Sequence, residues 1–148
     1  MRTPTMLKVP AGLIAAILTV ASLAPVAQAQ DSGFAARVNV PFAFQTASGQ
    51  HFGPGIYTIS MNGQQTMLVR GWKTSGLVMT QLASDGQPAT EGKAVFTHYG
   101  DRYFLRAVWV AGESSHLLCS SSKAERQSQI AAVKTPSTVD VALLQEGR

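Results

Sequence analysis

The chain contains very little cysteine. Cys119 is the only one, so no disulfide can form within the chain and the folded state must depend on buried side chains. We expect Cys119 to be a buried thiol, because it follows two leucines, Leu117 and Leu118. An intermolecular disulfide or a reactive thiol is the alternative.

Charge is also scarce and scattered. Charged residues make up 14% of the sequence, and the 12 Lys and Arg and 8 Asp and Glu give a net charge of +4. The cations form no run, whereas a surface that binds nucleic acid needs them clustered. We therefore expect no nucleic-acid partner.

Recognisable catalytic and metal-binding patterns are missing. The histidines His51, His98 and His116 show none of the close spacings typical of metal ligands. The carboxylates fall mainly in expected turns or near the ends, no G-x-S-x-G elbow occurs, and no lysine follows the glycines at 53–55 as in a phosphate-binding loop. The sequence predicts no metal, no cofactor and no catalytic residue, so we expect a protein that is not an enzyme.

One long apolar run is present, at the N-terminus. Arg2 and Lys8 precede a nearly apolar stretch over residues 11–24, and Ala27 and Ala29 occupy the −3 and −1 positions of a cleavable bond. The run is shorter than the roughly 20 residues that a membrane-spanning helix needs. We expect residues 1–29 to be a signal peptide cleaved after Ala29, and residues 30–148 to form a single exported domain, periplasmic or extracellular, without a membrane span.

Most of residues 30–148 alternate between apolar and polar side chains, which predicts β-strands with one buried face. Pro41 cannot donate to a strand ladder, so it marks an edge position or the point where the strand over residues 37–44 leaves the sheet. Residues 45–55 are expected to be a loop, and 77–83 a strand. Residues 56–61 and 66–70 resemble a hairpin. A two-residue turn would pair Ile59 with Thr66, whereas a three-residue turn would pair Ile59 with Met67; we prefer the second.

The clearest hairpin covers residues 93–99 and 102–110, joined by Gly100-Asp101. Its register predicts that Tyr99 pairs with Arg102 and Phe96 with Leu105. One face carries no formal charge and should point into the core: Ala94, Phe96, His98, Tyr103, Leu105, Ala107 and Trp109. The other mixes aromatic and cationic side chains: Lys93, Val95, Thr97, Tyr99, Arg102, Phe104, Arg106 and Val108.

A helix should follow a short strand at residues 116–119. Ser122 and Glu125 form a capping box that predicts its start. It should run to about residue 132, with Ala124, Ile130 and Ala131 as packing candidates, and a last strand over residues 139–143 should close the sheet. The predicted fold is mainly β: a single-domain antiparallel sandwich or small barrel of about eight strands, with one short helix before the last strand.

The segments V-P-F-A-F (residues 40–44), F-G-P-G-I-Y (52–57) and Y-G-D-R-Y-F-L (99–105), followed by S-K-A-E-R (122–126), resemble a group of small exported bacterial proteins without an assigned activity. In that group a V-P-F-x-F strand precedes L-P-A-G-x-Y, and in this chain Phe52-Gly53 and Gly55 replace the usual Leu and Ala. The resemblance implies a fold and a compartment, and it assigns no catalytic residue.

Three classes of function remain open. The first is binding of an envelope protein or glycan through the outer face of the hairpin, where Tyr99, Arg102, Phe104 and Arg106 are the candidate residues. These four residues have an alternative interpretation: they form an ordinary outer face, and its aromatic rings pack against the helix. The second class is a carrier of a small apolar ligand inside a barrel lined by Phe42, Phe96, Leu105 and Trp109. The third, a hydrolase, lacks any recognisable set of catalytic groups. Oligomeric state does not follow from the sequence.

Overall fold

The computed structural model describes residues 34–144. The predicted signal peptide, residues 1–29, lies outside them. The chain divides into two units, Met1–Gln30 and Asp31–Arg148, and only the second is described here. Within residues 34–144 no helix is long and apolar enough to cross a membrane. The elements of this range are β1 (Ala35–Val40), β2 (Phe44–Gln45), β3 (His51–Phe52), β4 (Gly55–Met61), β5 (Thr66–Arg70), β6 (Ser75–Ser84), β7 (Lys93–Tyr99), β8 (Arg102–Trp109), β9 (Ser115–Cys119), α1 (Lys123–Ala131) and β10 (Ser137–Leu144).

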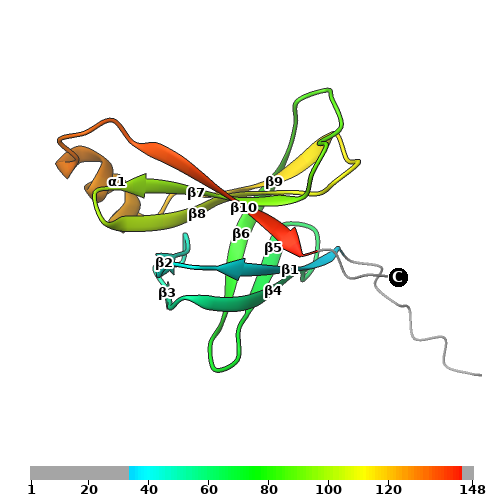
Figure 1. Ribbon diagram of the computed structural model, residues 1–148, viewed down its shortest axis with the longest axis horizontal. Coiled ribbons are helices and arrows are strands. Elements are labelled where there is room, and N and C mark those ends of the chain that lie inside the picture. The colour runs from blue at the N-terminus through cyan, green and yellow to red at the C-terminus, as the bar shows by residue number, and fades with distance from the viewer. Residues whose placement is uncertain (1–33, 145–148) are drawn as a thin grey trace, which may run out of the picture. The chain divides into compact units, whose positions relative to one another are not determined.

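Eight strands of the described range close into an antiparallel barrel, in the order β8-β7-β10-β1-β4-β5-β6-β9 and back to β8 (Figure 1). The mainly β prediction is confirmed, and of the two architectures left open by the sequence the barrel is the one adopted. The last strand, β10, lies between β1 and β7. It therefore closes the sheet, as expected, and it follows α1 as predicted.

Aromatic side chains fill one end of the barrel, here called the closed end. β1 stops at Val40, directly before Pro41, and the chain returns as β2, which pairs in parallel with the start of β8. β3, predicted as loop, pairs with β2. Their side chains Phe44 and Phe52 are buried, with ring centroids 5.0 Å apart, and Phe44 also lies 5.2 Å from Phe96. This packing leaves the barrel interior solid at the closed end.

The hairpin of β4 and β5 has the predicted faces but not the predicted register. Ile59 pairs with Val69, and Met61 with Met67, so the expected pairing of Ile59 with Met67 is wrong by two residues. The reason is a longer turn, in which the Asn62 N–H donates to the Thr66 carbonyl at 2.7 Å. A shift of two keeps every side chain on its own face, since strand side chains alternate with period two.

The hairpin of β7 and β8 follows the predicted register only as far as Phe96, which pairs with Leu105. Val95 then pairs with Ala107, so Arg106 is the extra residue of a β-bulge. Beyond it the faces of β8 are exchanged. Val108 is buried in the core cluster and Trp109 is outside it, which corrects the prediction that Trp109 points inward and Val108 outward.

The capping box of α1 is confirmed. The Ser122 Oγ accepts a hydrogen bond from the Glu125 N–H at 2.9 Å, and the helix begins at Lys123. Of its predicted packing residues, Ile130 (86% exposed) and Ala131 are exposed and only Ala124 is half-buried. Glu125 is the buried residue of the helix. The helix lies beside the β7–β8 hairpin near the Tyr99 end (Figure 1).

Candidate functional site: a groove beside Trp109

The two aromatic candidates of the predicted binding face lie under the helix. Phe104 is 1% exposed and Tyr99 is also buried, with ring centroids 5.9 Å apart at 67°. Phe104 does not belong to the core cluster inside the barrel. It lies on the outer face of the hairpin, beside Tyr99 and beneath the Arg102 guanidinium, which donates to Ser128 of α1. The alternative considered from the sequence, aromatic rings packed against the helix, describes these two residues.

Both arginine candidates donate hydrogen bonds to other side chains of the same domain. The guanidinium of Arg102 donates to Ser128 Oγ of α1 at 3.1 Å and to Gln45 Oε1 of β2 at 3.3 Å, and it lies 5.6 Å from the Phe104 ring centroid. Arg106 donates to Ser121 Oγ, in the segment that leads into α1. Their role in binding stays a prediction. Arg102 is exposed and Arg106 is partly exposed, so these two are the accessible members of the four-residue set.

A buried acid completes this helix-docking cluster. Glu125 is 3% exposed, and its Oε1 lies 3.9 Å from Arg106 Nη1. Burial raises the pKa of the Glu125 carboxyl, and Arg106 and the backbone N–H of Ser122 oppose part of that rise. Burial, and after it Glu125, raise the pKa of Tyr99. These contacts hold the helix on the hairpin, which is a structural task.

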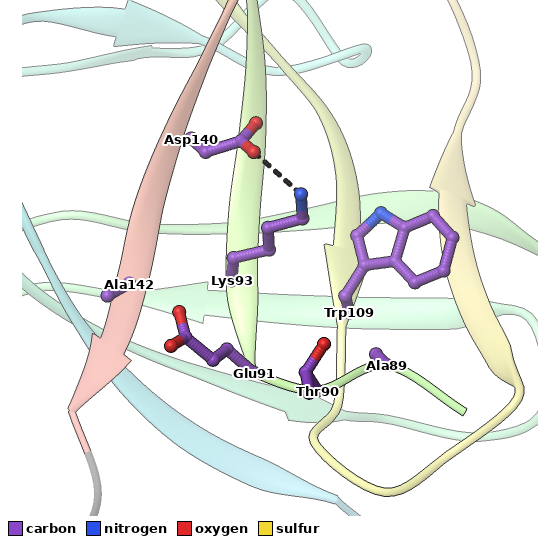
Figure 2. Close-up of a pocket in the computed structure, with 7 residues that line it drawn as sticks. All are labelled: Ala89, Thr90, Glu91, Lys93, Trp109, Asp140 and Ala142. Carbon is purple, nitrogen blue, oxygen red and sulfur yellow. Dashed lines mark hydrogen bonds and ion pairs between the residues drawn. The ribbon is translucent and has the colours of Figure 1, made fainter. Parts of the chain in front are cut away.

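A groove opens on the same outer face of the hairpin, at the end away from α1, around Trp109 (Figure 2). Three neighbouring strands supply its walls, β8 with Trp109, β7 with Lys93, and β10 with Asp140. The loop before β7 closes one side. Its volume is about 580 Å³, and the lining residues are Ala89, Thr90, Glu91, Lys93, Trp109, Asp140 and Ala142.

The bulge at Arg106 is what places Trp109 in this groove. Without the extra residue, strict alternation would keep Trp109 on the side of Leu105, inside the barrel. With it, Trp109 pairs with Lys93 and turns its indole to the outside. Sequence reasoning missed the site for this reason. A bulge leaves no signal in the segment L-R-A-V-W (residues 105–109), where apolar residues fit either register.

The groove is held in shape by backbone bonds and by stacking. The Ala89 N–H donates to the Glu113 carbonyl at 2.9 Å and the Gly112 N–H to the Ala89 carbonyl at 2.8 Å. The Trp109 indole lies flat on the His116 imidazole of β9, with centroids 3.8 Å apart and planes at 12°. A site already fixed in shape loses less conformational entropy when a ligand binds.

Charged groups adjoin the indole. Lys93 Nζ lies 2.6 Å from Asp140 Oδ2, and both side chains are partly exposed. In Figure 2, Lys93 stands between Asp140 and Trp109, and Glu91 lies on the far side of the groove from the indole. The groove is thus lined by two carboxylates, one ammonium and a half-buried aromatic ring. Such a surface offers hydrogen-bond acceptors, a donor and an apolar face together.

The barrel interior expected to line a carrier is filled at these positions. Phe96 and Leu105 are buried in the core as predicted. Phe42 is partly buried and stacks on Tyr103, with centroids 4.0 Å apart. Trp109 lies on the outer wall, which corrects its place in the expected lining.

The remaining chemical candidates are dispersed. Among residues 34–144, no three His, Cys, Asp or Glu side chains gather in a way that could hold a metal ion. His98 stacks on Tyr103 at 4.2 Å, and its Nδ1 lies 3.5 Å from Ser137 Oγ. Cys119 is free and buried, as expected, and burial raises the pKa of its thiol to about 12.

Comparison with models of protein families, with curated proteins and with solved structures found no match to this chain. The resemblance to small exported bacterial proteins therefore stays a prediction.

Proposed function

We propose that this chain is an exported, non-enzymatic binding domain that holds a glycan of the cell envelope in the groove beside Trp109. The observation that carries the proposal is the outward-facing indole next to the Lys93–Asp140 pair. A sugar ring has an apolar face of C–H groups and a rim of hydroxyl groups. The indole suits the first, and the charged groups and Thr90 suit the second.

The charges narrow the class of glycan. Glu91 and Asp140 carry two negative charges against the single positive charge of Lys93, and Asp140 is already paired with Lys93. A uronic acid would bring a further carboxylate next to Glu91. Neutral sugars and amino sugars are therefore favoured over anionic ones.

The test uses three soluble oligosaccharides of matched length: chitin oligomers, which are neutral, chitosan oligomers, which carry amines, and oligogalacturonates, which carry carboxylates. Isothermal titration should detect binding of the first two and not of the third. Trp109→Ala should weaken binding by about 30-fold, the loss typical of an aromatic residue at the centre of a binding site. Trp72→Ala is the matched control, because Trp72 is 94% exposed and lies outside the groove.

Two results would contradict the proposal. The first is a complete lack of binding to all three oligosaccharides. The second is binding that Trp109→Ala leaves intact. In either case a protein partner becomes the better candidate for the outer face.

A further inference from the structure

A separate pocket lies at the end of the barrel opposite the closed end. This end is here called the open end. The first pair of β1 and β4, Ala35 with Ser60, lies at this end, as does the pair of Ser84 with Ser115 that joins β6 to β9. The pocket measures about 470 Å³. This volume falls within the range of about 300–1,000 Å³ that is usual for small-molecule sites.

The wall of the open-end pocket is mostly apolar and comes from β4, β6 and β9 and from residues next to the ends of β1 and β8. The apolar lining residues are Phe34, Met61, Leu82, Val110 and Leu117. Leu82 is 73% exposed although it belongs to β6. Contact between this large aliphatic side chain and water is unfavourable. A bound apolar chain would cover the side chain and remove that cost.

A polar group of the same pocket has no protein partner. His116 lines the pocket and is buried, and its Nδ1 has no hydrogen-bond partner among the described residues. Buried polar atoms in folded proteins nearly always find a partner. A ligand whose head group can form hydrogen bonds would supply a partner for the His116 imidazole if it bound in this pocket.

The charge of the lining specifies that head group. Glu113 is the charged residue among the nine that line the pocket, and the other polar ones are Gln64, Ser115 and His116. An anionic head group would meet the Glu113 carboxylate, whereas a cationic one is attracted to it.

We propose that the open-end pocket binds a small cationic amphiphile, with its aliphatic chain against Phe34, Met61 and Leu82 and its amine near Glu113. This site is separate from the groove beside Trp109, because the two share no lining residue. It also differs from the barrel interior in which the sequence analysis placed a carrier's ligand, because side chains fill that interior.

The test titrates the exported protein with decylamine and with decanoate, which share the alkyl chain and differ in the charge of the head group. Calorimetry should show one saturable site, at least tenfold tighter for decylamine. Octylamine should bind about tenfold more weakly than decylamine, the change expected for two buried methylene groups. In a Trp72→Phe background, Trp109 is the only tryptophan, and its fluorescence should change because it stacks on His116.

Substitutions at exposed positions separate binding from folding. Leu82→Ser should weaken decylamine binding about tenfold. Leu77→Ser, on the same strand but facing the outer wall and 49% exposed, should not change it. Glu113→Gln should abolish the preference for decylamine over decanoate. Lys93→Ala, in the groove, should leave amine binding intact, so this site and the proposed glycan site can fail separately.

Three outcomes would overturn the proposal: no saturable binding of decylamine, equal effects of Leu82→Ser and Leu77→Ser, or decanoate binding as tightly as decylamine.

Discussion

Replacing Phe104 tests whether the outer face of the β7–β8 hairpin is a second layer of core or an open surface. Phe104 is 1% exposed, in contact with the Tyr99 ring and below the Arg102 guanidinium. Truncating a buried phenylalanine costs about 3–5 kcal/mol, from lost burial and from the cavity left behind. A domain of this size has a total stability of only about 5–15 kcal/mol, so Phe104→Ala should come close to unfolding it.

Urea unfolding followed by circular dichroism measures this change. Phe104→Leu keeps most of the volume and should lose about 1 kcal/mol. Trp72→Ala, at a solvent-exposed turn, should stay within about 0.5 kcal/mol of the parent. Hydrogen exchange should show that Phe104→Ala exposes the amides of α1 first, because Arg102, which lies over this ring, donates to Ser128 of the helix. The reasoning is refuted if Phe104→Ala costs no more than Trp72→Ala, since Phe104 would then be as free as a surface residue.

Three further predictions concern the thiol, the buried acid and export. Cys119 should not react with a disulfide reagent in the native protein but should react fully in denaturant, because burial raises its pKa to about 12; rapid native labelling would contradict this. Burial raises the pKa of Glu125, so the folded state holds that proton more tightly than the unfolded state, and stability falls as pH rises through the ordinary carboxyl pKa of about 4.3 towards the raised one. Glu125→Gln should therefore gain stability relative to the parent as pH rises above about 4.3, and a difference independent of pH would contradict that. The exported chain should have the intact mass of residues 30–148; retention of residues 1–29 would show that no cleavage follows Ala29.

Local signals in the sequence predicted most of the fold. The turn at Gly100-Asp101 fixed the start of the β7–β8 register, Pro41 marked the end of β1, and the Ser122–Glu125 box marked the start of α1. Each depends on residues close in sequence, whose backbone preferences act without tertiary context.

The candidate groove could not be predicted in this way. It depends on the bulge at Arg106, which adds one residue to a strand whose apolar residues suit both registers. It also depends on barrel closure, which brings β10 beside β7 and so places Asp140 next to Lys93. Both features come from pairing between distant segments, and a single sequence carries no record of such pairing.

The most direct test of the proposed function is a nuclear magnetic resonance titration of residues 30–148 with chitosan oligomers. The account predicts that the largest shifts belong to the Trp109 indole N–H and to the backbone amides of Thr90 and Lys93, with little change at Arg102 or along α1. Shifts concentrated at Arg102 and α1 would return the binding role to the face first indicated by the sequence. No saturable shift anywhere would contradict glycan binding.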